Sequence, residues 1–203
     1  MKRSVFFLVV LVFLSACSEP TTKLSPLIQT QPILAFGDSL TFGYGAAKEQ
    51  SYPAQLSTLI NIPVINAGIS GELSEQGVKR LESLLTLHNP QLLLLCHGGN
   101  DILKNRDLNT MAGNLKEMVR LAQQRGIAVV LLAVPRPGLI LSPLEQYQQV
   151  ADEMQIIIEN EVITDVLQRP KYHRDMIHPN SLGYQEIARA IANLLDKHGA
   201  ISL

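Results

Sequence analysis

Short, wholly apolar runs alternate along this chain with amphipathic stretches, and this alternation limits the folds open to it. The run Leu92–Cys96 is apolar throughout, and residues 127–134 are rich in β-branched side chains. A strand that is apolar on both faces is typical of a parallel sheet covered by helices on both sides. The pattern therefore predicts an α/β fold, a three-layer α/β/α sandwich with a central parallel sheet.

The boundaries of the expected elements follow from the apolar spacing and from turn residues. Pro53 suits the first turn of a helix, and Gly126 suits the end of another. The chain has 203 residues, enough for one domain of this type, which we place at 32–203. We expect strands at 33–36, 64–66, 92–96, 127–134 and 156–158, and helices at 52–60, 74–88, 108–125, 144–154 and 181–197.

The chain begins with the pattern of a secretory signal. Lys2 and Arg3 precede an apolar stretch, Val5–Leu14, that is too short to span a bilayer as a helix. Ser15 and Ala16 then precede Cys17, a pattern that looks like a bacterial lipobox. We therefore expect a lipoprotein signal peptide at 1–16 and a lipid on Cys17. An ordinary secretory signal is the alternative.

A polar segment with several prolines separates this cysteine from the domain. Residues 17–31 have no periodic apolar pattern, so they are expected to form the lipidated Cys17 and a flexible tether. The lipid would hold the domain at a membrane without a spanning helix. The expected location is the cell envelope, facing the periplasm, on the outer membrane if the cell has one.

Charge and cysteine content argue against several classes of partner. The formal net charge is −1 and the body of the chain has no cluster of Lys and Arg, whereas nucleic acids require concentrated positive charge. With Cys17 lipidated, Cys96 has no disulfide partner and is expected to be a buried strand residue. The spacing of Cys and His is not that of a metal site.

Polar and glycine-rich segments follow the expected strands. They are Gly37-Asp38-Ser39-Leu40, Asn66 to Gly71, Gly98-Gly99-Asn100-Asp101 and, before the last helix, Asp175 to Asn180. In an open parallel sheet the functional site lies beyond the carboxyl ends of the strands. The four segments are therefore expected to meet at one edge of the sheet.

Three of these residues have the types needed for nucleophilic catalysis. The hydroxyl of Ser39 needs a base to become a nucleophile, and His178 can serve, with Asp175 three residues earlier to orient its ring. The alternatives are that Ser39 caps a helix and that Asp175 caps the final helix. His173 is a competing base without an equivalent upstream acid.

Acyl transfer also needs donors aimed at the oxygen that becomes negative. The backbone N–H of Gly68 and the side-chain amide of Asn100 are candidates, because a glycine allows close approach and an amide carries N–H groups. The alternative is that the glycines only end strands.

With these four blocks in order, the sequence resembles the SGNH, or GDSL, hydrolase family, nearest the bacterial arylesterase and thioesterase I/lysophospholipase L1 branch. The resemblance covers essentially the whole domain and implies a flavodoxin-like sheet and no metal or organic cofactor. It implies that Ser39 is the nucleophile, His178 the base and Asp175 its partner, and that Ser39, Gly68 and Asn100 form the oxyanion hole. Cys96 and His97 depart from the family pattern.

The expected function is a serine esterase that hydrolyses carboxylic esters or thioesters, such as aryl esters, acyl thioesters or lysophospholipids. One alternative is an O-acetyl esterase or acyltransferase on cell-envelope glycans. Another is a non-catalytic envelope lipoprotein that retains the fold. A nucleotide binder is disfavoured because no Gly-rich phosphate loop of the usual spacing occurs. The apolar loop 135–144 lines an acyl pocket or packs on the core.

Overall fold

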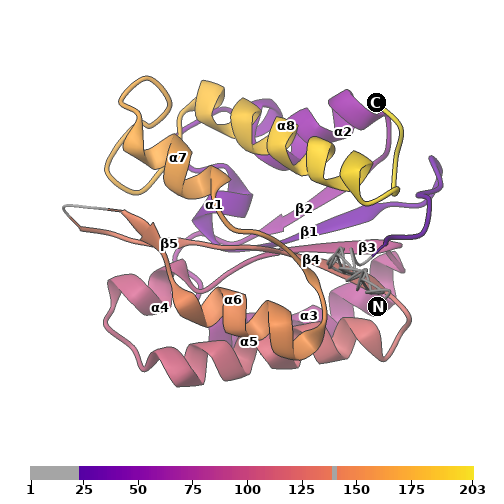
Figure 1. The fold of residues 1–203 in the computed structure, drawn as a ribbon, viewed down its shortest axis with the longest axis horizontal. Coiled ribbons are helices and arrows are strands. Elements are labelled where there is room, and N and C mark those ends of the chain that lie inside the picture. Colours follow the sequence, from indigo (N-terminus) through magenta and orange to yellow (C-terminus); the bar gives the residue numbers. More distant parts are fainter. Residues whose placement is uncertain (1–22, 139–140) are drawn as a thin grey trace, which may run out of the picture.

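The computed structural model describes residues 23–138 and 141–203. Within these residues five parallel strands form one sheet in the order β2-β1-β3-β4-β7, and a short two-stranded antiparallel ribbon, β5-β6, projects from one end (Figure 1). The strands are β1 (Ile33–Gly37), β2 (Val64–Gly68), β3 (Leu92–Cys96), β4 (Ala128–Leu132), β5 (Pro135–Arg136), β6 (Ser142–Pro143) and β7 (Ile157–Glu159).

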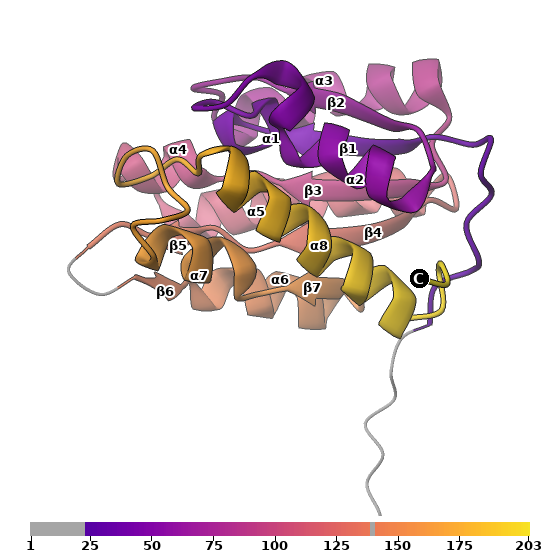
Figure 2. The ribbon, with the colours of Figure 1, turned by 90° about the horizontal axis from the view of Figure 1, so that it is seen from above.

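Helices cover both faces of the sheet, which confirms the predicted three-layer sandwich. In Figure 1, α2, α7 and α8 lie above the sheet and α3, α5 and α6 below it, and Figure 2 shows the upper layer from above. The helices are α1 (Ser39–Phe42), the 3₁₀ helix η1 (Lys48–Gln50), α2 (Tyr52–Ile60), α3 (Ser74–His88), α4 (Gly99–Leu103), α5 (Leu108–Gln123), α6 (Glu145–Met154), α7 (Val162–Gln168) and α8 (Ser181–Lys197).

The centre of the core is the pair of strands β1 and β3. Every residue of both strands is buried, and the four leucines of β3 are fully buried. Burial of one such side chain stabilises the fold by about 1.5–3 kcal/mol. The two strands pair in register from Ile33 with Leu92 to Gly37 with Cys96, so the loops that follow them start side by side.

Several short elements were not predicted. Helices α1, α4 and α7 are too short to show a clear apolar period, and α4 begins with a glycine, which disfavours a helix. The strand expected at 127–134 ends at Leu132, and the chain then turns into the β5-β6 ribbon. Both α1 and α4 lie at the carboxyl end of the sheet, where the site is expected.

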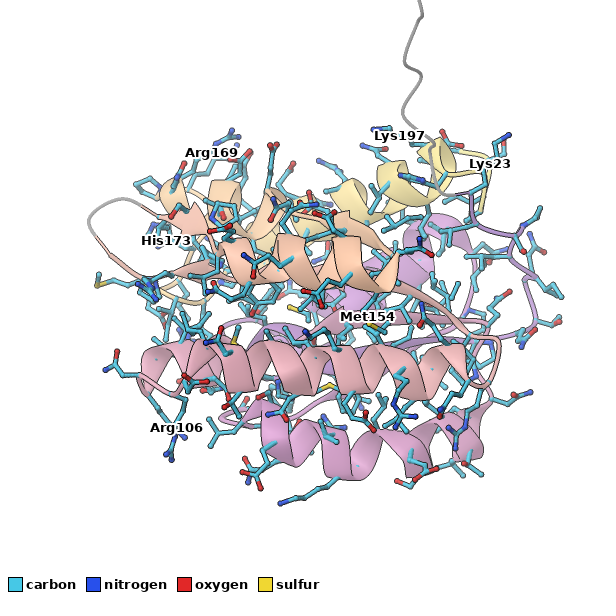
Figure 3. The ribbon with its side chains drawn as sticks, turned by 60° about the horizontal axis from the view of Figure 1, so that its bottom comes forward. Lys23, Arg106, Met154, Arg169, His173 and Lys197 are labelled. Atoms are coloured by element: carbon cyan, nitrogen blue, oxygen red, sulfur yellow. The ribbon has the colours of Figure 1, made fainter. Side chains whose placement is uncertain are left out.

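The start of the described chain is tied to its end. The N–H groups of Leu24 and Leu27 donate to the carbonyls of His198 (3.0 Å) and Ala200 (2.7 Å). Figure 3 shows Lys23 close to Lys197, with His173 at the other end of the molecule. The tether was predicted at 17–31. Its described part, from Lys23 onward, lies against the domain, because Leu24 and Leu27 make these backbone hydrogen bonds and their side chains pack against the core.

The expected signal peptide and the lipidated Cys17 lie outside the described residues. From Lys23 onward, in the segments that the structure covers, no helix is long and apolar enough to cross a membrane.

Candidate active site

The first loop of the site is the turn from β1 into α1. The carboxylate of Asp38 accepts hydrogen bonds from the N–H of Leu40 (3.1 Å) and of Gly99 (3.2 Å), which joins this turn to the loop after β3. Burial raises the pKa of Asp38 from its ordinary value. Through its bond from Leu40, Asp38 is the N-cap of α1. Ser39 is the first residue of this helix and does not cap it. The side chain of Ser39 remains available to the cavity that it lines.

Ser39, His178 and Asp175 lie together, as the sequence predicts. The Oγ of Ser39 is 3.1 Å from Nε2 of His178, and Nδ1 of the same ring is 3.0 Å from each carboxylate oxygen of Asp175. A carboxylate can only accept, so Nδ1 carries the ring proton and the Nε2 lone pair faces the serine hydroxyl. This is the arrangement in which an imidazole can take the proton of a serine.

Asp175 is held in place by its own turn. Its carboxylate accepts hydrogen bonds from the N–H of Ile177 (3.0 Å) and of His178 (2.9 Å). Burial alone would raise the pKa of Asp175, but these bonds and the His178 ring together hold that pKa below its ordinary value. Asp175 is thus an anion at neutral pH, available to stabilise a protonated His178.

The alternative roles of these residues do not match the structure. Asn180, and not Asp175, caps α8: its side chain accepts from the N–H groups of Leu182 and Gly183. His173 pairs with Pro179 through its backbone and does not line the cavity around Ser39. His178 is the histidine that this turn brings to the serine.

Gly68 does not occupy the predicted position. Its N–H donates to the side-chain oxygen of Asn66 at 3.0 Å, and it is not among the residues that line the cavity. A Cβ at Gly68 would lie 2.1 Å from the backbone nitrogen of Phe42. Gly68 therefore allows β2 to pack closely against α1, and its N–H is already paired, so the prediction that it serves in an oxyanion hole is not supported.

Gly71, three residues later, lies on the cavity wall instead. It has φ +81°, a left-handed conformation that favours glycine, and open space around it. No hydrogen bond from its N–H is present among the described residues. The sequence segment Asn66 to Gly71 holds both glycines, and the pattern alone does not show which one turns its N–H into the cavity.

Asn100 is also on the cavity wall, as predicted. Its Nδ2 donates one hydrogen bond to the carbonyl oxygen of Glu72, at 3.0 Å. An amide nitrogen carries two N–H groups, so the second is available to a ligand. Ser39, the first residue of a helix, likewise has a backbone N–H without a partner in that helix.

The cavity beside Ser39 has a volume of about 250 Å³ and a mainly apolar wall. One side comes from the loop 135–144, for which the sequence left two roles open. Pro135, Pro137 and Leu141 of this loop line the cavity; Leu139 and Ile140 lie outside the described residues. The other apolar residues of the wall are Leu40, Leu103, Val134, Leu167, Met176 and Ile177.

Among residues 23–138 and 141–203, no group of three or more His, Cys, Asp or Glu side chains is arranged to hold a metal ion. Cys96 is buried, as expected.

Comparison with known proteins gives relatives over most of the chain. The GDSL-like Lipase/Acylhydrolase family matches residues 35–186. An arylesterase of Vibrio mimicus is 31% identical over 202 residues, covering 94% of this chain and 96% of that protein. The thioesterase 1/protease 1/lysophospholipase L1 of Escherichia coli strain K12 is 28% identical over 182 residues, covering 86% and 82%.

A solved structure of an esterase is also similar to this chain. The psychrotrophic esterase EstA from Pseudoalteromonas sp., in a structure inhibited by monoethylphosphonate, has a TM-score of 0.72 and 25% sequence identity. The match covers 82% of this chain and 99% of that one. The fold described above is thus similar to that of an ester hydrolase.

Gly68 is packed against α1 and Gly71 has open space around it, so replacement of each by alanine should change the stability of the fold by different amounts. Gly68→Ala should lower the free energy of unfolding by about 3 kcal/mol or more, because the new Cβ would overlap the backbone of α1. Gly71→Ala should lower it by only about 1–2 kcal/mol, the cost of a left-handed alanine. Urea denaturation of both variants measures the difference. Equal losses of the free energy of unfolding in the two variants would contradict this difference in packing.

Proposed function

This chain belongs to the GDSL-like lipase/acylhydrolase family and is a serine ester hydrolase, and we propose that Ser39 is its nucleophile, with His178 as base and Asp175 as the acid that orients it. The observation that carries this assignment is the line of contacts from Ser39 Oγ to His178 Nε2 and from His178 Nδ1 to Asp175. A non-catalytic role, the alternative left open by the sequence, does not agree with membership of this family.

The reaction proceeds in two steps under this assignment. His178 takes the proton of the Ser39 hydroxyl while the Oγ of Ser39 attacks the ester carbonyl carbon, which forms a tetrahedral intermediate. The protonated ring, stabilised by Asp175, then gives this proton to the departing alcohol or thiol, and an acyl-enzyme remains. A water molecule attacks the acyl carbon while His178 takes a proton from it, and collapse returns the proton to Ser39 and releases the acid.

Three donors would stabilise the negative oxygen of each tetrahedral intermediate. They are the backbone N–H of Ser39, the side-chain amide of Asn100 and, in place of Gly68, the backbone N–H of Gly71. All three residues line the cavity, and the N–H of Gly68 is paired elsewhere. Removal of one such donor typically lowers kcat by about 10²–10³-fold.

Replacement of the nucleophile tests the assignment. Ser39→Ala should lower kcat for a para-nitrophenyl ester by at least about 10⁴-fold and abolish covalent labelling by a fluorophosphonate. The phosphonate-inhibited structure of the Pseudoalteromonas esterase suggests this class of reagent. The matched control is Ser83→Ala, which should retain full activity, because the Ser83 hydroxyl donates to the Arg80 carbonyl on α3 and does not line the cavity. Undiminished turnover by Ser39→Ala would refute the assignment.

The apolar wall supports an ester with a hydrocarbon acyl group as substrate. Leu103, Leu141 and Ile177 face the same cavity as Ser39, and a buried methylene is worth about 0.8 kcal/mol. This favours acyl esters longer than acetate over the O-acetyl groups of glycans. Aryl esters of longer acids, acyl thioesters and lysophospholipids all meet this description.

Chain length offers a quantitative test of the cavity. Across para-nitrophenyl esters from acetate upward, kcat/KM should rise by about fourfold per added methylene until the cavity is full, and then level off. Leu141→Trp, on the cavity wall, should move the plateau to shorter chains. Leu87→Trp, on an exposed site of α3, should leave it unchanged. A profile that is flat from acetate onward would show that the acyl chain lies elsewhere.

We propose further that Cys17 carries a lipid that holds the hydrolase at the periplasmic face of an envelope membrane. Support comes from the sequence alone: a basic start, the apolar stretch Val5–Leu14, and small residues before the cysteine. Acyl chains on a terminal cysteine give membrane attachment without a spanning helix.

Substitution of the cysteine tests the anchor. In a bacterial host supplied with radioactive palmitate, the wild-type protein should carry label and sediment with membranes. Cys17→Ser should lose the label, because position 17 then has no thiol to be acylated and the remaining cysteine, Cys96, is buried. Ser18→Ala, the neighbouring control, should keep it. If the wild-type protein is unlabelled and mass spectrometry shows that it is cleaved at another bond, the ordinary secretory signal is favoured.

A further inference from the structure

A group of charged and polar side chains, two of them buried and one 20% exposed, lies next to the loops that carry Gly71 and Asn100. Its members are Glu72, Arg80 and His97. The exposed fraction is 6% for Glu72 and 0% for His97. None of the three lines the cavity, so they do not touch the substrate, and the reaction described above does not use them.

The carboxylate of Glu72 is at the centre of this group. Arg80 donates to its two oxygens from Nε and Nη2, each at 2.6 Å, and Nε2 of His97 lies 3.0 Å from Oε2. Burial alone would raise the pKa of Glu72, but the bonds from His97 and Arg80 and the charge of Arg80 hold that pKa below its ordinary value. Glu72 is therefore an anion whose charge is balanced by Arg80.

Arg80 fixes this carboxylate to the ends of two strands. Its Nη2 also donates to the carbonyl oxygens of Gly37 (3.2 Å) and Ala67 (2.8 Å). The guanidinium lies 3.9 Å from the centre of the Phe36 ring, a favourable cation–π contact. Gly37 at the end of β1 and Ala67 near the end of β2 are thus both joined to Glu72 through Arg80.

His97 connects the same carboxylate to the loop after β3. Its Nδ1 accepts a hydrogen bond from the N–H of Gly98 at 2.9 Å. The ring proton is therefore on Nε2, which donates to Glu72. The hydroxyl of Tyr147 donates to the carbonyl of His97 at 2.7 Å, so the backbone there is fixed as well.

Helix α3 is shaped to admit this ring. A Cβ on Gly77, inside the helix, would lie 2.6 Å from Nε2 of His97. A glycine within a helix costs roughly 0.5–1 kcal/mol relative to alanine. The chain thus accepts a weaker helix at this point, and the space that results is filled by the imidazole.

We propose that the Arg80–Glu72–His97 cluster positions two donors of the oxyanion hole, the N–H of Gly71 and the amide of Asn100. Glu72 follows Gly71 directly in the chain, and its own carbonyl accepts the hydrogen bond from Asn100 Nδ2 at 3.0 Å. One clamped residue thereby sets the direction of both donors. This inference rests on the proposed function, because it assigns a task to residues behind the same hole.

The negative charge of Glu72 must also be neutralised. A bare carboxylate near the hole would repel the oxygen that becomes negative in the transition state. The bidentate contact with Arg80 neutralises Glu72 at close range. The cluster can therefore position the donors without opposing the charge that they stabilise, and all three members are positioning residues.

Kinetics can separate positioning from a purely structural role. Glu72→Gln should lower kcat for a para-nitrophenyl ester by about 10–100-fold, because a donor displaced by a fraction of an ångström loses much of its effect. KM should stay within about twofold, since the donors act mainly on the transition state. The affinity for a reversible transition-state analogue, a trifluoromethyl ketone, should fall in proportion to kcat. Glu75→Gln, at an exposed pair on the same helix, is the matched control and should change none of these values.

A second pair of variants keeps the test decisive if Glu72→Gln folds poorly. His97→Gln keeps one group that can donate to Glu72 and one that can accept from Gly98, so it should retain most of kcat. His97→Leu, of similar size, removes both and should lose about tenfold or more. Equal kcat in the two His97 variants, or an increase of KM with kcat unchanged, would overturn the proposal. Failure of the proposed function has a different signature, an active Ser39→Ala variant.

Discussion

The site depends on the parallel pairing of β1 with β2 on one side and β3 on the other. Register places Gly37 beside both Gly68 and Cys96, so three loops leave the sheet from adjacent points. One carries Asp38 and Ser39, one contains Gly71 and one contains Asn100. A shift of one residue in either pairing would move a donor by about 3.3 Å, far beyond the tolerance of a hydrogen bond. The apolar runs that specify the sheet therefore also specify the site.

Buried polar groups then link these loops to one another. Asp38 joins the turn after β1 to the loop after β3 through the N–H of Gly99, and Asp101 accepts bonds from the N–H (2.9 Å) and the hydroxyl (2.8 Å) of Ser74 at the start of α3. Each of these carboxylates has a backbone N–H as partner, which limits the energetic cost of burying it. The catalytic edge is thus rigid through hydrogen bonds, while the rest of the domain is rigid through apolar packing.

The sequence was sufficient for the layers of the fold and for the Asp175–His178 pair, because apolar strands and an acid three residues before a histidine are local patterns. The meeting of Ser39 with His178, 139 residues apart, was predicted from the common edge at which parallel strands end and from the family resemblance. The sequence was insufficient for the choice between Gly68 and Gly71. That choice depends on the hydrogen bond from Gly68 to Asn66 and on a left-handed turn at Gly71, which no spacing reveals. The task of His97 was equally hidden: its partner Glu72 and the space left by Gly77 are 25 and 20 residues away in the chain.

The bonds from Leu24 and Leu27 to the end of α8 fix where the chain leaves the domain. Helix α8 has 17 residues and is about 26 Å long; it starts just after His178 and ends beside Leu24. An anchor on Cys17 would have only six residues of extended chain before Lys23, about 20 Å at most. The proposed anchor would then hold the domain at the end of α8 that lies away from His178 and the cavity.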